Sequence, residues 1–219
     1  MDENQVQSQG GVTLIGGAKP SAETLEEALK FAPMLVAADG GADCALALGH
    51  RPDAVIGDFD SVSKQARAAL SGATFIEIAE QETTDFEKCL RCIDAPLVIA
   101  AGFAEARVDH TLAVFSVLAR RVGPPCVVLT ETDAIFAPPS RISLDLDPGS
   151  RLSLFPMANV TGRSEGLEWP IDGLKLSPMG RVGTSNRVTG PVRLAFDAPG
   201  MLVITPRAAL PRCLDALAG

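Results

Sequence analysis

Six short apolar runs, separated by helical patterns over the first 130 residues, limit the fold of this sequence more than any other feature. Such runs are typical of strands buried on both faces of a parallel sheet. We expect strands at Val12–Ile15, Met34–Ala38, Ala54–Ile56, Thr74–Ile78, Leu97–Ala101 and Val127–Leu129. We expect helices at Ala22–Phe31, Ala42–Leu48, Ser63–Leu70, Asp85–Ile93 and His110–Arg121. This alternation predicts an α/β domain with a mostly parallel sheet.

After about Asp133 the pattern changes to short, often alternating apolar segments separated by Gly, Pro, Asp and Asn. The expected strands are Ile142–Leu146, Ser150–Phe155, Leu174–Leu176, Val192–Phe196 and Leu202–Thr205. They predict a small all-β domain, a sandwich or partial barrel. We therefore expect an N-terminal tail at 1–10, an α/β domain at 11–137 and a β-sandwich domain at 138–219, joined near Ala137-Pro138-Pro139-Ser140.

Charge and composition favour a cytoplasmic protein. A net charge of −8 argues against a nucleic acid or an anionic membrane as partner, because both need a basic surface. No apolar run approaches the roughly 20 residues of a membrane span, and the acidic start is unlike a secretory signal. Five scattered cysteines make no disulfide framework. We interpret Cys89 and Cys92, a C-x-x-C inside a helical pattern, as buried helix cysteines rather than a metal or redox pair.

Four polar motifs follow the expected strands, at the edge where open parallel sheets bind ligands. They are Ala38-Asp39-Gly40-Gly41-Ala42, Gly57-Asp58-Phe59-Asp60-Ser61, Glu80-Gln81-Glu82-Thr83-Thr84-Asp85 and Arg107-Val108-Asp109-His110. In the first motif, glycines that open a helix let backbone N–H groups approach a phosphate or ribose closely. An ordinary Asp-Gly turn is the alternative reading.

The second motif points to a hard cation. Asp58 and Asp60, two residues apart in extended chain, would point the same way and could both ligate Mg²⁺, which prefers oxygen ligands. The alternative is an Asp-rich turn in which Asp60 caps the next helix. Asp85 could equally be an N-terminal charge on its helix. Arg107 with Asp109 combines a phosphate-binding fork with a carboxylate, whereas His110 alone suggests a structural residue.

Taken together and in order, these motifs resemble those of the thiamine pyrophosphokinases. Further matches are Thr84-Asp85-Phe86, Arg107-x-Asp109-His110-Thr111, Gly166-Leu167-x-Trp169 and Thr184-Ser185-Asn186, so that the resemblance runs from about Val12 to Ile204. It implies an α/β catalytic domain before a β-sandwich domain that binds thiamine and dimerises. It also implies a homodimeric enzyme that transfers a diphosphoryl group from ATP to the thiamine hydroxyl, with Mg²⁺ as cofactor.

The resemblance also implies roles for individual residues. Asp58, Asp60 and Asp85 would hold Mg²⁺ and, with Arg107, carry the catalysis. The nucleotide site would comprise Asp39, Gly40, Gly41, Arg107, Asp109, His110 and Thr111. Thiamine would bind at the subunit interface against Gln81, Asp85, Trp169, Ser185 and Asn186.

The sequence departs from the family pattern at three places. Glu105-Ala106 stand where two glycines are common before the arginine, Val114 stands where an Asn is frequent, and Arg187 replaces an acidic or small polar residue. None of these is a proposed metal ligand. Two alternatives stay open at this level: a pyrophosphokinase that acts on a pterin alcohol, and a non-catalytic module that binds a nucleotide or thiamine.

Overall fold

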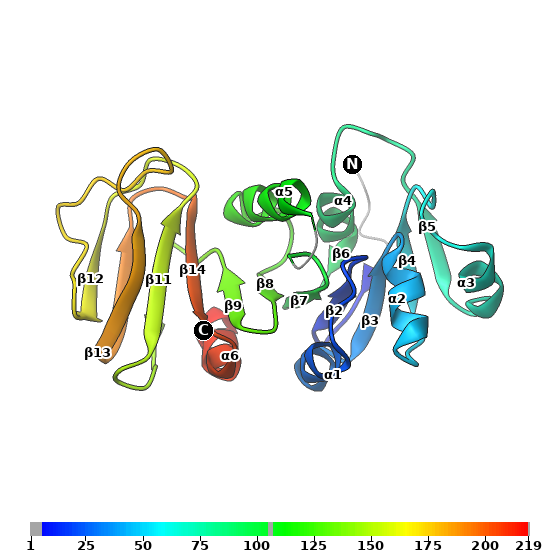
Figure 1. Ribbon diagram of the computed structural model, residues 1–219, viewed down its shortest axis with the longest axis horizontal. Helices are drawn as coiled ribbons and strands as arrows, with labels where there is room; N and C mark the ends of the chain where they lie inside the picture. Colours follow the sequence, from blue (N-terminus) through cyan, green and yellow to red (C-terminus); the bar gives the residue numbers. More distant parts are fainter. Residues whose placement is uncertain (1–5, 105–106, 219) are drawn as a thin grey trace. The chain divides into compact units, whose positions relative to one another are not determined.

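The computed structural model describes residues 6–104 and 107–218. The chain divides into two compact units (Figure 1). One comprises Met1–Val117 with Val122–Glu131, and the other comprises Leu118–Arg121 with Thr132–Gly219.

The first unit is an α/β domain built on parallel strand pairs. β3, β4 and β5 form one parallel set, and β2, β7 and β8 form a second. An antiparallel bridge between Val12 and Pro33 links the two sets. The strands are β2 (Val12–Ile15), β3 (Met34–Ala38), β4 (Ala54–Gly57), β5 (Thr74–Glu77), β7 (Val98–Ala101) and β8 (Cys126–Leu129). All six expected strands are therefore confirmed, as is the parallel pairing.

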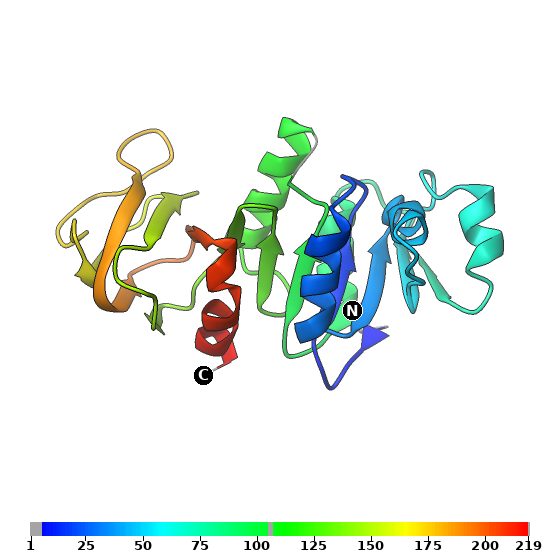
Figure 2. The same cartoon turned by 60° about the horizontal axis from the view of Figure 1, so that its bottom comes forward.

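Helices cover these strands. α1 lies across β2 and β7 (Figure 2), α2 contacts β2 and β3, and α4 contacts β3 and β4. The helices are α1 (Ala22–Phe31), α2 (Gly41–Ala47), α3 (Lys64–Ala69), α4 (Asp85–Cys92) and α5 (Val108–Ala119). Ser21, Ser63 and Thr84 cap α1, α3 and α4, because each side-chain oxygen accepts the backbone N–H three residues later. These caps fix where the helices begin.

The N-terminal segment corrects one expectation. Val6–Gln7 form β1, which pairs in parallel with β6 (Ile93–Asp94), although the sequence placed both residues in a tail. Val6 is 3% exposed, so burial of its side chain and pairing with the edge of β6 offset the cost of ordering it. Residues 1–5 of the expected tail lie outside the described residues.

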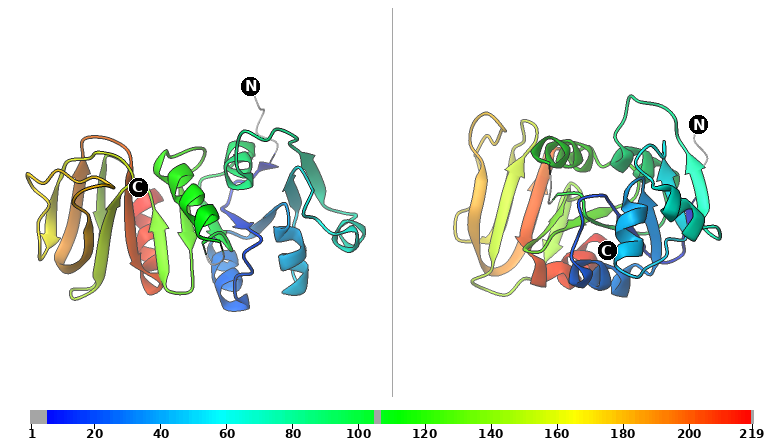
Figure 3. Two further views of the ribbon diagram at one scale, coloured as in Figure 1. Left: turned by 45° about the horizontal axis from the view of Figure 1, so that its top comes forward. Right: turned by 45° about the vertical axis from the view of Figure 1, so that its right-hand side comes forward.

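The second unit is antiparallel and β-rich, as expected. Strand order is β10-β13-β11-β14-β9, with β12 also paired to β13 (Figure 3). The strands are β9 (Asp133–Phe136), β10 (Arg141–Leu144), β11 (Arg151–Pro156), β12 (Gly162–Leu167), β13 (Gly183–Phe196) and β14 (Met201–Pro206). A 3₁₀ turn, η1 (Arg207–Ala209), leads into the closing helix α6 (Leu210–Ala218). β13 serves two sets of partners, since residues 183–187 pair with β11 and residues 192–195 with β10.

In the second unit, one expected strand is absent and three strand segments were not expected. Leu174–Leu176 is no strand: Leu174 N–H closes a turn on Ile171 and only Leu176 forms isolated bridges. The unexpected segments are β9, β12 and the first half of β13. Most residues of β12 are polar or glycine, so its sequence lacks the apolar alternation that marks a strand.

Cys89 and Cys92 are buried, free thiols in α4, which confirms the helix-cysteine interpretation. The cysteines of the chain are all free. Within residues 6–104 and 107–218, no helix is long and apolar enough to cross a membrane.

Truncating a core side chain of β11 should destabilise the second unit. Leu154→Ala removes a fully buried side chain, and the cavity should lower the free energy of unfolding by about 2–5 kcal/mol. Met179→Ala, at a fully exposed position of the same unit, should stay within about 0.5 kcal/mol of wild type. Denaturant unfolding followed by fluorescence of Trp169, which lies in this unit, measures both. Equal midpoints for the two variants would contradict the burial of Leu154.

Candidate active site

A pocket of about 590 Å³ lies in the first unit, where polar loops follow β2, β3, β4 and β7. This volume is within the range of small-molecule sites. The residues predicted from the sequence that line it are Asp39, Gly40, Asp58, Asp60, Gln81, Asp85, Arg107 and His110. Gly16, Gly17, Lys88 and Phe103 also line it, and none of these four was a predicted site residue. The rule that ligands bind at the carboxyl ends of parallel strands therefore located this pocket.

Asp39 directly follows β3 and is the most buried carboxylate of the pocket, at 4% exposed. Its backbone is left-handed, with φ of 42°. Oδ2 accepts a hydrogen bond of 3.2 Å from the Ser61 N–H, and Oδ1 is buried without a hydrogen-bond partner in the described chain. Burial raises the pKa of Asp39, with smaller contributions from Asp85, Asp60 and Asp58. A buried, unpartnered carboxylate oxygen of this kind is suited to a cation.

Asp58 and Asp60 flank a strained residue, Phe59, whose φ is 63°. The expectation that this stretch is extended is therefore wrong. Phe59 packs edge-on against Phe75, at 5.4 Å between ring centroids, and lies under the Arg67 guanidinium at 4.8 Å. These contacts hold the left-handed turn, which lets the carboxylates on either side of Phe59 converge.

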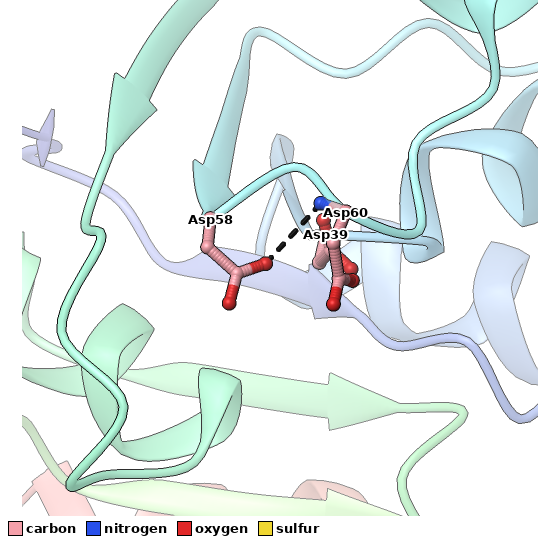
Figure 4. Close-up of side chains that lie close together, drawn as sticks. All are labelled: Asp39, Asp58 and Asp60. Atoms are coloured by element: carbon pink, nitrogen blue, oxygen red, sulfur yellow. Dashed lines mark hydrogen bonds between the residues drawn. The ribbon is translucent and has the colours of Figure 1, made fainter.

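Ligand oxygens of Asp39, Asp58 and Asp60 lie within 4.8 Å of one another (Figure 4). The Asp60 N–H also donates to Asp58 Oδ1 at 3.2 Å. Three carboxylates this close repel one another unless a cation lies among them. Their donor set is the oxygen-rich set that Mg²⁺ prefers, so the residues present fit a hard divalent cation.

Asp85 is the first residue of α4 and lies against Lys88, one turn later. Lys88 Nζ is 3.3 Å from Asp85 Oδ1 and 3.6 Å from Asp58 Oδ2, and its side chain is only 2% exposed. Burial raises the pKa of Asp85 and Lys88 opposes this change. Although burial lowers the pKa of Lys88, Asp85 and Asp58 outweigh it and leave that pKa raised. Lys88 is thus a fixed positive charge between two of the expected metal ligands.

Gln81 lies beside the same carboxylates. Its Nε2 donates a hydrogen bond of 2.7 Å to Asp58 Oδ2, and this bond is the largest cause of the lowered pKa of Asp58. The side chain expected to contact thiamine therefore also fixes the orientation of Asp58.

The motif at the start of α5 lies partly in the pocket. Arg107 and His110 line it, whereas Asp109 and Thr111 are not among its described lining residues. Arg107 and Asp109 form an exposed ion pair of 2.6 Å, and the hydrogen bond from Arg107 lowers the pKa of Asp109. Glu105 and Ala106 lie outside the described residues.

Gly41 is a packing residue in this structure. A Cβ at Gly41 would lie 2.2 Å from the Ile15 carbonyl oxygen. The glycine therefore lets α2 approach β2, and Gly40 is the glycine of this motif that lines the pocket.

The remaining predicted residues belong to the second unit. Trp169 follows β12 and is 54% exposed. Asn186 on β13 is 5% exposed, and its side-chain amide bonds the backbone of Trp169 at both N–H (3.1 Å) and C=O (2.6 Å). Ser185 has a left-handed φ of 59°, and its N–H donates to Ser153 Oγ. The two bonds from Asn186 hold the backbone of Trp169 against β13 while most of the indole stays exposed.

Removing the buried ammonium should strengthen metal binding. Lys88→Met takes a positive charge away from Asp58 and Asp85, so Mn²⁺, used as a spectroscopic probe, should bind about threefold to tenfold more tightly. Electron paramagnetic resonance of free Mn²⁺ measures the affinity. Lys64→Met, at an exposed position of α3, is the matched control and should leave it unchanged. Weaker or unaltered Mn²⁺ binding by the Lys88 variant would show that the cation does not bind beside this ammonium.

Comparison with known proteins places the chain in a family. The family model described as the thiamin pyrophosphokinase catalytic domain matches residues 25–128, and that of the thiamin pyrophosphokinase vitamin B1 binding domain matches residues 140–201. A relative from rice (Oryza sativa subsp. japonica), thiamine pyrophosphokinase 1, is 27% identical over 220 residues, which cover 81% of this chain and 83% of the relative.

Solved structures share the fold. Thiamin pyrophosphokinase from Candida albicans superposes with a TM-score of 0.78 at 18% identity, covering 94% of each chain. The yeast thiamin pyrophosphokinase superposes with a TM-score of 0.75 at 19% identity, covering 97% of this chain and 90% of that one. With both domain models matched in order, the chain belongs to the thiamin pyrophosphokinase family.

Proposed function

We propose that this protein is a thiamine diphosphokinase, which transfers a diphosphoryl group from ATP to the hydroxyl of thiamine and releases AMP. Membership of the family supports the proposal. The observation that carries it is the pocket in which carboxylates and Arg107 face one space. An acidic pocket of this kind binds a polyphosphate when a divalent cation lies between the two sets of negative charges.

The two domains take separate parts in the proposal. Residues 11–137 bind the nucleotide and metal, and residues 138–219 bind thiamine and form a homodimer. Gln81 then faces Trp169 and Ser185 of the partner subunit across the thiamine site. The exposed indole of Trp169 supports this assignment, because an aromatic face attracts a cationic ring. The free thiols of all five cysteines support a reducing compartment, the cytoplasm.

Mg²⁺ is the proposed cofactor, with Asp58, Asp60 and Asp85 as its ligands. The orphaned Oδ1 of Asp39 and its closeness to Asp58 and Asp60 add Asp39 to this carboxylate set. When bound, the cation supplies neutralisation of phosphate-oxygen charge. The choice of these ligands is supported by their shared pocket.

The side chains of the chain position the reactants. Lys88 forms ion pairs with Asp58 and Asp85, and these pairs fix the orientation of both carboxylates. Arg107, whose guanidinium is paired with Asp109 in the structure, is the proposed contact to the phosphate oxygens, where it stabilises charge that develops on them. Gly16, Gly17 and Gly40 line the pocket without side chains, so the nucleotide approaches their backbone closely. The remaining nucleotide-site residues of the proposal are Gly41, Asp109, His110 and Thr111, and Asn186 completes the thiamine site.

Bond changes follow from this arrangement. The thiamine hydroxyl oxygen attacks the β-phosphorus in line, and the bond from the β-phosphorus to the oxygen that bridges it to the α-phosphorus breaks. AMP leaves with that oxygen, and Asp85 accepts the hydroxyl proton. Positioning supplies most of the acceleration in such a transfer.

Product analysis tests the reaction. Purified protein with ATP, thiamine and Mg²⁺ should form AMP and thiamine diphosphate in equal amounts, and EDTA should stop both. AMP formed with a pterin alcohol but not with thiamine would overturn the substrate. Binding of ATP without AMP from either alcohol would overturn catalysis and leave a nucleotide-binding module.

Asp60→Asn should abolish most turnover while the fold survives. The amide loses the negative charge that the metal site needs, so kcat should fall by about 100-fold or more, with an unaltered circular dichroism spectrum. Asp94→Asn, at an exposed position of β6, should keep wild-type turnover. Near-normal kcat in the Asp60 variant would remove Asp60 from the metal site.

A further inference from the structure

Trp169, the only tryptophan of the chain, has a cation beside its ring. The guanidinium carbon of Arg187, from β13, is 5.9 Å from the indole centroid, within the range of a cation–π contact. The residue nevertheless stays 54% exposed. The indole is thus partly covered by a positive charge of the protein itself and partly open to solvent.

Arg187 is held in this place from two directions. Its Nε pairs with Glu168 Oε2 at 2.7 Å, and its backbone C=O accepts the Glu168 N–H at 2.9 Å. Asn186 clamps the backbone of Trp169 with two hydrogen bonds and also accepts the Arg187 N–H at 2.8 Å. One ion pair and four hydrogen bonds therefore join Glu168, Trp169, Asn186 and Arg187 into one cluster.

We infer that Arg187 and Glu168 set the charge selectivity of the ligand site at Trp169. This inference rests on the proposed function, in which that ligand is thiamine with its thiazolium cation. A cation that stacks on the open part of the indole is attracted by the ring and repelled by the Arg187 guanidinium. Glu168 offsets this repulsion, because its carboxylate lies against the same guanidinium.

Neutralising Glu168 and neutralising Arg187 should therefore change the affinity for thiamine in opposite directions. Glu168→Gln leaves the guanidinium unbalanced, so the Kd for thiamine should rise by about twofold to fivefold. Arg187→Gln leaves the Glu168 carboxylate unpaired beside the open indole, so the Kd should fall by a similar factor. A merely structural role would instead weaken binding in both variants, because both break the same ion pair.

Binding of a neutral ligand shows whether the ligand's charge or its shape causes these changes in Kd. The thiophene isostere of thiamine replaces the thiazolium with an uncharged ring of almost the same form. Its Kd should be the same in wild type and in both variants, because an uncharged ring has no charge–charge interaction with Arg187 or Glu168. Equal shifts for thiamine and for the isostere would overturn the inference and assign the pair a structural role.

Quenching of Trp169 fluorescence by ligand measures each Kd directly, on the full chain and without turnover. Arg193→Gln is the matched control, since Arg193 pairs with Glu165 at 2.8 Å across the same strands β12 and β13. It should leave the Kd for thiamine at the wild-type value.

Failure of the inference and failure of the proposed function look different in these titrations. Thiamine that quenches the wild type but gives one Kd in all variants overturns the inference alone. Absence of quenching in the wild type overturns the thiamine site at Trp169, and the inference with it.

Discussion

The gathering of four carboxylates at one edge of a parallel sheet is the constraint on which the rest of the first unit depends. Asp39, Asp58 and Asp60 lie within mutual ligand distance, and Asp85 lines the same pocket. Such a cluster is unfavourable without positive charge, because the like charges repel one another at short range. Lys88 supplies part of the compensation from inside the protein, and a divalent cation is the proposed source of the rest.

The packing around the pocket serves the same cluster. Asp39 and Phe59 adopt left-handed backbone conformations that cost energy for residues with a side chain. Phe59 contacts the Phe75 ring of β5 and the Arg67 guanidinium of α3, so these contacts fix the direction of the two carboxylates beside it. Gln81 then fixes Asp58 by a hydrogen bond. Stability and function are therefore linked through particular contacts: the aromatic packing that stabilises the loop also shapes the site.

Sequence patterns predicted the first unit well and the second unit less well, for a physical reason. Strands buried on both faces need continuous apolar runs, which stand out in a sequence. β12 and the first half of β13 have exposed polar positions and glycines, so they resemble loops. Val6 is in a strand only because it pairs with Ile93 of β6, which lies almost 90 residues away in the sequence. Local patterns carry no signal for such long-range pairing.

The candidate site likewise has residues that the sequence indicated and features that only the structure shows. Asp58, Asp60, Asp85 and Arg107 belong to polar motifs that follow buried strands and are conspicuous in the sequence, and the family resemblance implied their roles. All four line one pocket. The left-handed turn at Phe59 could not be predicted, because the spacing of two aspartates is compatible with several backbone conformations. Lys88 was missed because a lysine in an amphipathic helix usually faces solvent; only its place three residues after Asp85 gave a signal. Arg187 was noted as a departure, and the structure places it over Trp169.

The central claim is that this pocket directs attack at the β-phosphorus of ATP. Two ATP analogues test it most directly, because each blocks a different bond. With thiamine and Mg²⁺, β,γ-imido-ATP should still yield AMP, since its terminal unit is transferred whole, whereas α,β-methylene-ATP should be inert because its bond to the α-phosphorus cannot break. If instead ATP yields ADP and thiamine monophosphate, attack occurs at the γ-phosphorus and the account of the site is wrong.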